Sequence, residues 1–242
     1  TKPFSMIENI VACLELHIEQ GKVLEQKKTD IGVVRSIPSI SRFSVEINGQ
    51  AGHSGTILMD QRADALVTSS EIITFVNKLA LRLSKESNQH FVSTIGKINV
   101  HPNAAAIIPG KVEMTIDLRA SSISSRDQYI KELEKQIKIM NKNGPCKIEM
   151  KNIAFAPYVE MDKELVKLFK ESSDDYGFSN IIMDSGAGHD TSHLSRVAPA
   201  SMIFVPCKDG LSHCPEEYAE IYDISKGTAV LFKMVEKLAK SI

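Results

Sequence analysis

The chain has 242 residues, of which 43% are hydrophobic and 24% are charged, as in a globular protein with one large domain or two small ones. Its net charge of -1 comes from interspersed charges, which argues against a nucleic-acid-binding surface. No run approaches the roughly 20 apolar residues of a membrane span, and the four cysteines lack CxxC spacing. We therefore expect a soluble, cytoplasmic protein with reduced thiols, which binds no nucleic acid or membrane and whose partners are small molecules or protein chains.

The first expected elements are two strands. Residues 14–18 alternate apolar and polar side chains, the period of a half-buried strand, and this places His17 on a polar face near the strand end. A short helical run over residues 22–28 follows. Residues 31–34 form a second apolar strand before Pro38 breaks the pattern.

The middle of the chain predicts a self-contained set of elements. Alternating or apolar runs predict strands at residues 43–47, 91–100, 112–118 and 146–150, and helical spacing predicts helices at residues 60–83 and 124–140. The second helix is expected to begin at a serine cap, Ser124. The resulting order, β-α-β-β-α-β, is that of the ferredoxin-like split βαβ arrangement.

After Pro157 the sequence returns to alternating helices and strands. The expected elements are a helix at residues 162–176, a strand at 181–183, a glycine turn, a short helix, a second strand at 201–205, a long loop and a final helix at 225–240. Two separated segments of this kind belong to one α/β layer with an insertion. We place the layer in residues 1–38 and 154–242 and the insertion in residues 39–153; with about four strands the layer is smaller than a typical sheet.

Four clusters combine histidine with glycine or with a strand end, where side chains converge on a ligand. They are LELHIEQG at residues 14–21, GQAGHSGT at 49–56, SGAGHDTSH at 185–193 and VPCKDGLSHCPEE at 205–217. His189 and His193 have the i, i+4 spacing of a zincin metal pair, but the glutamate that such a site requires is missing. We therefore place His189 in a strand-to-helix turn and assign no role to His193, while His90 and His101 are expected to be structural or solvated.

Together, the four clusters and the segment PNAAAIIPGKVEMTIDLR at residues 102–119 resemble the M20-type metallohydrolases. The resemblance covers essentially the whole chain, and HIEQG and SGAGHD point to the branch of N-carbamoyl-L-amino-acid hydrolases, β-ureidopropionases and allantoate amidohydrolases. It implies part of an α/β catalytic domain with an inserted ferredoxin-like dimerisation or lid domain. It also implies two divalent metal ions, Zn or Mn, a small carboxylate substrate and a homodimer formed through the inserted domain.

The resemblance also implies roles for individual residues. His17 corresponds to a ligand of one metal ion and His213 to a ligand of the other. His53 corresponds to a catalytic histidine that reaches the active site of the partner subunit and polarises the substrate carbonyl. Three residues correspond to substrate-binding positions: Gln20, His189 and Arg119, the last as the planar donor for the substrate carboxylate.

Several features depart from the family pattern. The asparagine of the NxIPG motif, a substrate-carboxylate contact, is replaced by Ala106, and Ile57 and Leu58 replace a threonine and a proline. The family's other metal ligands (a histidine, a bridging aspartate and a glutamate) and its general-base glutamate lie in an N-terminal region without a counterpart here. His17 and His213 alone cannot build a two-metal centre.

The sequence thus predicts a metal-dependent hydrolase of linear amide bonds in carbamoyl or ureido carboxylates. We expect this chain alone to lack appreciable activity and to bind metal weakly. Three alternatives remain: a related M20 peptidase or deacylase, a non-catalytic truncated fragment that still dimerises, and a split enzyme whose N-terminal half is a separate chain.

Overall fold

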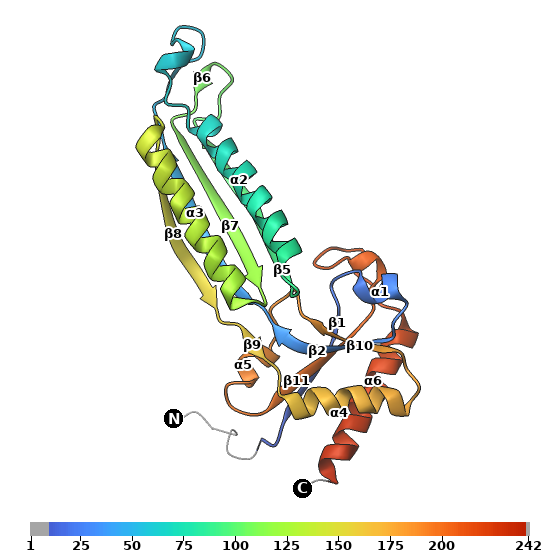
Figure 1. Cartoon of the computed structure of the whole chain (residues 1–242). Coiled ribbons are helices and arrows are strands. Elements are labelled where there is room, and N and C mark those ends of the chain that lie inside the picture. The colour runs from blue at the N-terminus through green and yellow to red at the C-terminus, as the bar shows by residue number, and fades with distance from the viewer. Residues whose placement is uncertain (1–9, 241–242) are drawn as a thin grey trace, which may run out of the picture. The chain divides into compact units, whose positions relative to one another are not determined.

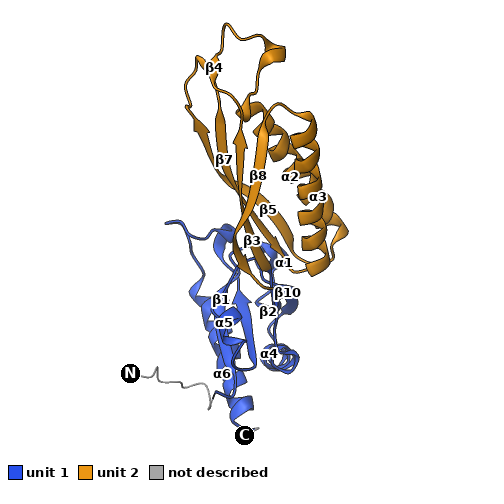
Figure 2. Cartoon of the chain, turned by 90° about the vertical axis from the view of Figure 1, so that its left-hand side faces the viewer, with its two compact units in different colours: residues 1–38, 158–242 blue, residues 39–157 orange. Residues whose placement is uncertain are grey.

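The structure, a computed structural model, describes residues 10–240. The chain divides into two compact units, unit 1 with residues 1–38 and 158–242 and unit 2 with residues 39–157 (Figure 2). The insertion was expected to end at residue 153, but its last strand continues to Ala156. The chain therefore leaves unit 2 at Pro157.

Unit 1 contains one mixed sheet. Its strands are β1 (Cys13–Ile18), β2 (Ile31–Ile37), β9 (Val159–Glu160), β10 (Asn180–Asp184) and β11 (Ala200–Val205). The order is β1-β11-β2-β10, and β9 pairs with β2. The pairs β1–β11 and β2–β10 are parallel, whereas β11 and β2 are antiparallel. The carboxyl ends of β1 and β11 therefore lie side by side.

The helices of unit 1 differ in which face of the sheet they contact. They are α1 (Val23–Lys27), α4 (Lys163–Asp175), α5 (Thr191–Leu194) and α6 (Ile221–Ala239), with the 3-10 turn η3 (Lys208–Gly210). Side chains of alternate strand residues, Ile203 and Val205 among them, pack with α4 and α6. Met202 and Phe204 point to the opposite face and pack with Leu24 of α1. The period of two in the strands thus assigns one face to the long helices. The other face carries a second apolar cluster and, on β1, the polar residues Glu15 and His17.

Unit 2 is a four-stranded antiparallel sheet. Its strands are β3 (Ser39–Asn48), β5 (Phe91–His101), β7 (Lys111–Ala120) and β8 (Lys147–Ala156), in the order β5-β7-β3-β8. The helices α2 (Ala65–Glu86) and α3 (Ile123–Asn143) lie on the same face of the sheet (Figure 1). Three shorter elements, β4 (Gly52–His53), η2 (Met59–Gln61) and β6 (Ile107–Ile108), occupy the end where α2 begins (Figure 1).

Three helix starts were predicted incorrectly. Helix α2 begins at Ala65 and not at residue 60, because the side chain of Asp64 accepts hydrogen bonds from the backbone N–H groups of Leu66 and Val67. Helix α3 is capped by Ser122, whose hydroxyl accepts from Ser125 N, and not by residue 124.

Helix α6 begins at Ile221, earlier than the predicted residue 225. The hydroxyl of Ser225 donates to Ile221 O within the helix and does not form a cap. Among the helices that residues 10–240 form, none has both the length and the apolar character needed to cross a membrane.

Candidate metal centre and substrate site

His17 lies near the end of β1, on the sheet face opposite α4 and α6. It pairs in register with Phe204 of β11. Its Nδ1 is 2.8 Å from the carbonyl oxygen of Ile18. Because a carbonyl oxygen only accepts, Nδ1 carries the proton, and the lone pair of the neutral ring is on Nε2. This is the arrangement of a metal-binding histidine whose orientation is set by a backbone acceptor.

Glu15 and His189 lie beside His17. Each of these three residues offers a ligand atom, and these atoms all lie within 4.8 Å of one another. Glu15 Oε1 is 3.8 Å from His189 Nδ1, and Glu15 Oε2 accepts from the backbone N–H and the hydroxyl of Thr191, the first residue of α5. Glu15 therefore connects β1 to the turn that carries His189.

His189 is buried and hydrogen-bonded. Its Nε2 is 2.8 Å from Ser185 Oγ, and its ring centroid is 4.8 Å from that of His17. Burial, reinforced by the neighbouring charge of His17, lowers the pKa of His189 to about 4. At neutral pH the ring is therefore uncharged.

The loop after β11 packs closely on the turn after β1. Gln20 Nε2 donates to Ser212 Oγ at 2.7 Å. Gly210 has a φ of +64°, and a Cβ there would lie 2.7 Å from Lys22 Cγ and 2.8 Å from the carbonyl carbon of Gly21. Glycine at 210 thus permits a backbone approach that any side chain would obstruct.

His213 is exposed and has a φ of +59°, and Gln20 has a φ of +58°. Non-glycine residues seldom adopt this left-handed region, and those that do cluster at binding sites. Glu217 Oε2 accepts from the backbone N–H of His213 at 2.9 Å. The Ser212 hydroxyl and this N–H lower the pKa of Glu217, and the His213 and His17 side chains contribute in the same direction. Both histidines are thus near enough to the Glu217 carboxylate to contribute to its lowered pKa.

A divalent metal ion suits part of this donor set. His17 Nε2 has its lone pair available, and imidazole and carboxylate are ordinary ligands of Zn. However, Glu15 Oε2 already accepts a hydrogen bond from Thr191, and His189 Nε2 is already hydrogen-bonded to Ser185. Among the residues the structure describes, no further carboxylate completes this cluster. The residues fit a metal ion but do not by themselves form a two-metal centre.

His53 lies in unit 2, in strand β4, which pairs with β6. Its side chain is exposed. Its Nδ1 accepts from the backbone N–H of Gly55 at 3.0 Å. A ring that accepts at Nδ1 carries its proton on Nε2, so the exposed ring can act as a hydrogen-bond donor.

Arg119 lies near the end of β7 and is linked to Asp117. Its Nε donates to Asp117 Oδ1 at 2.9 Å, and Arg42 Nε donates to Asp117 Oδ2 at 2.8 Å. Burial acts to raise the pKa of Asp117, but the hydrogen bonds from Arg42 and Arg119 outweigh it, and the pKa lies below its ordinary value. The ionised carboxylate therefore holds the Arg119 fork in one orientation.

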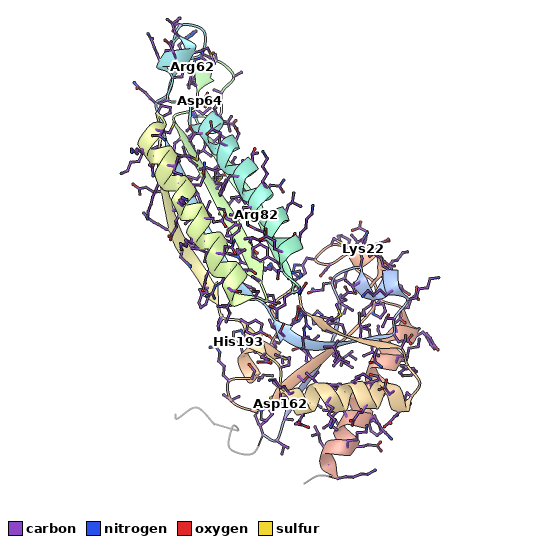
Figure 3. The ribbon with its side chains drawn as sticks, in the orientation of Figure 1. Lys22, Arg62, Asp64, Arg82, Asp162 and His193 are labelled. Carbon is purple, nitrogen blue, oxygen red and sulfur yellow. The ribbon has the colours of Figure 1, made fainter. Side chains whose placement is uncertain are left out.

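The sequence interpretation missed four residues: Glu15, Ser185, Thr191 and Glu217. Glu15 could have been recognised, since it is two residues before His17 on the same strand face. Ser185 and Thr191 acquire their roles only by folding. His193 is exposed in the short helix α5 (Figure 3).

Comparison with known proteins agrees with these observations. The model of the family described as "Peptidase family M20/M25/M40" matches residues 4–237. An N-carbamoyl-L-amino-acid amidohydrolase from Pseudomonas sp. (strain NS671) is 37% identical over 232 residues, covering 96% of this chain and 55% of that protein. An allantoate amidohydrolase from Bacillus subtilis (strain 168) is 38% identical over 236 residues, again covering 96% and 55%.

A solved structure is also similar. The amidase of the hydantoinase/carbamoylase family from Burkholderia multivorans superimposes with a TM-score of 0.86 at 33% identity, covering 93% of this chain and 54% of that one. The chain thus spans about half the length of the relatives it matches. From the family match and these similarities, the chain belongs to the M20/M25/M40 peptidase family.

Proposed function

We propose that this chain is part of a metal-dependent amidohydrolase that cleaves a linear carbamoyl or ureido amide bond in a small carboxylate substrate. The observation that carries the proposal is the hydrogen bond of His17, whose Nδ1–H is bonded to Ile18 O, so that the lone pair is on Nε2 of a residue that lies on the sheet face opposite α4 and α6. The names of the relatives, an N-carbamoyl-L-amino-acid amidohydrolase and an allantoate amidohydrolase, support the substrate class.

His17 and His213 would each hold one of two divalent ions, Zn or Mn. When bound, such ions supply a Lewis acid and lower the pKa of water, so that a nucleophile is available at neutral pH. The remaining ligands and the general base would come from a further polypeptide segment. The relatives are long enough to contain one, since this chain matches only 55% of their length.

The other site residues of this chain would bind and orient the substrate. Arg119, held at Nε by Asp117, would bind the carboxylate through its planar fork. Gln20 and the uncharged His189 would exchange hydrogen bonds with the carbamoyl or ureido group. With Ala106 in place of the expected asparagine, Arg119 would carry a larger share of carboxylate recognition.

Unit 2 would serve as a ferredoxin-like dimerisation domain, and His53 would act in the active site of the partner subunit. There its Nε2–H would stabilise the oxyanion that develops as the carbonyl is attacked. Its exposure and its accepting Nδ1 support this role. When the further polypeptide segment is supplied, mixing a His53→Ala chain with a His17→Ala chain should restore part of the activity, because one of the two sites in the mixed dimer receives both intact residues. If heterodimers form and remain inactive, the cross-subunit role is wrong.

Metal analysis combined with a substrate panel tests the proposal. The panel contains N-carbamoyl amino acids, allantoate, ureidoglycolate, N-acyl amino acids and dipeptides. The chain is assayed alone and together with the first half of the Bacillus subtilis relative as a separate polypeptide. Alone, it should bind fewer than two ions and show no turnover. With the added segment it should bind two ions and hydrolyse ureido or carbamoyl substrates.

Three outcomes would contradict parts of this proposal. Chelator-sensitive turnover by the chain alone would show that no further donors are required. Two bound ions without hydrolysis of any substrate would overturn the proposed activity. Activity confined to N-acyl amino acids or dipeptides would identify a deacylase or peptidase.

A further inference from the structure

Arg62 has unusual hydrogen-bond partners for a half-buried arginine. Its Nε and one terminal nitrogen donate to Ile57 O at 3.0 and 2.9 Å, and the same terminal nitrogen donates to Ser54 O at 2.7 Å. Arg62 is absent from the ion pairs formed within residues 10–240. Its guanidinium is therefore used to bind the backbone of residues 54–57.

The segment that Arg62 binds immediately follows His53. The carbonyl oxygen of His53 accepts from the backbone N–H groups of Thr56 and Ile57, at 3.4 and 3.3 Å, which makes residues 53–57 a tight turn. The backbone N–H of Ser54 donates to Ala106 O at 3.0 Å. These backbone bonds secure one end of the turn, and the guanidinium secures the carbonyl oxygens along it.

Within this turn the His53 ring lies against Gly55. Gly55 N–H donates to His53 Nδ1 at 3.0 Å. A Cβ on Gly55 would lie 3.3 Å from His53 Cε1, which is closer than most such contacts, and 3.5 Å from Nδ1, which is an ordinary contact. Gly55 thus both donates to the ring and leaves room for it. This bond requires the turn to hold the Gly55 N–H at the ring plane.

We propose that Arg62 is a positioning residue for His53: by closing the turn at Ser54 O and Ile57 O, it keeps Gly55 N–H bonded to His53 Nδ1 and so presents Nε2–H outward as a fixed donor. The inference rests on the proposed function, because only an oxyanion-stabilising role makes a fixed Nε2–H useful. It also gives Arg62 a role that a lysine cannot fill. A single ammonium lacks the planar arrangement of donors that reaches both carbonyl oxygens.

Nuclear magnetic resonance on the full chain tests the geometry directly. With 15N labelling, at a pH well above the ordinary histidine value of about 6.5, the scalar coupling across the Gly55 N–H···Nδ1 bond is measured. His53→Gln assigns the signal. The wild type should show the coupling and an Nε2-protonated ring. Arg62→Lys and Gly55→Ala should each weaken or abolish the coupling and speed amide exchange at Ile57.

The matched control is Arg82→Lys. Arg82 lies on α2, away from the end of unit 2 where Arg62 is found (Figure 3), and it binds the carboxylates of Glu86 and Glu132. The substitution Arg82→Lys should leave the coupling unchanged. Circular dichroism confirms that each variant is folded. Absence of the coupling in the wild type, or its persistence in Arg62→Lys, would overturn the inference.

Turnover in the assembly with the added segment is measured separately. Arg62→Lys should lower kcat by up to about 10²-fold, as misplacement of a catalytic group does, and should leave metal content unchanged. If Arg62→Lys weakens the coupling but His53→Ala retains full kcat, the catalytic role proposed for His53 is wrong, whereas the positioning of its ring by Arg62 is confirmed. Loss of the coupling in Arg62→Lys with unchanged kcat would instead show that the fixed ring does not matter for catalysis.

Discussion

Replacing Gly210 by alanine should destabilise unit 1 and disturb the loop that carries His213. A Cβ at this position would lie 2.7 Å from Lys22 Cγ and 2.8 and 2.9 Å from the carbonyl carbon and oxygen of Gly21. The lysine side chain can move, but the Gly21 backbone is held by the turn after β1. The loop must therefore shift, which would break the bond between Gln20 and Ser212.

Gly177 provides a matched control, because its φ of +68° is close to the +64° of Gly210 but a Cβ at Gly177 would meet no atom within 4 Å. Gly177→Ala should lower the free energy of unfolding only by the strain of placing alanine in the left-handed conformation, about 1–2 kcal/mol. Gly210→Ala should lower the free energy of unfolding by the same strain and also by the displacement of the loop, roughly 2–4 kcal/mol in total.

Urea unfolding followed by circular dichroism gives the two free energies, and zinc titration reports on the site. Gly210→Ala should weaken zinc binding, and Gly177→Ala should not. Equal costs for the two substitutions would show that the close approach to Gly21 is not rigid. Unchanged zinc binding in a destabilised Gly210→Ala chain would show that the loop does not hold a ligand.

Individual contacts lead to three further predictions. Asp64→Ala should lower the free energy of unfolding by about 1 kcal/mol through loss of the α2 cap, whereas Asp60→Ala, in the preceding turn, should be close to neutral; equal effects in urea unfolding would contradict the observed helix start. Burial raises the pKa of Tyr129 from 10.0 to about 12, so the protonated side chain contributes fully to the free energy of unfolding below pH 10, and this contribution, roughly 2–3 kcal/mol, is lost as pH rises through 12. Tyr129→Phe should remove this part of the alkaline destabilisation, and an identical pH dependence of stability in both proteins would refute the prediction. In the assembled enzyme, Arg119→Lys should raise KM with metal content unchanged, since charge is kept but the planar fork is lost; a change in metal content instead would point to a structural role.

Much of the fold could be predicted from local patterns. The alternation in residues 112–118 predicted β7, where Val112, Met114, Ile116 and Leu118 are buried. Helix starts were less accurate, because several polar residues near residue 60 and residue 122 could act as caps. Which of them does so depends on the backbone geometry of the preceding turn, and this geometry is not encoded in the residue type alone.

The candidate site, too, could be predicted from the sequence only in part. The sequence by itself determined which histidines lie at strand ends and in glycine-rich turns, because strand periodicity and glycine mark such positions within a few residues. Only the tertiary structure decided which of them meet. His189 lies against His17, since Thr191 of α5 donates to Glu15 of β1, and the loop of Ser212 lies against Gln20, because β1 and β11 are parallel neighbours. The proton positions on His17 and His53 were also decided by folding. Each depends on a hydrogen bond to one particular backbone group, and the placement of that group is a property of the folded turn.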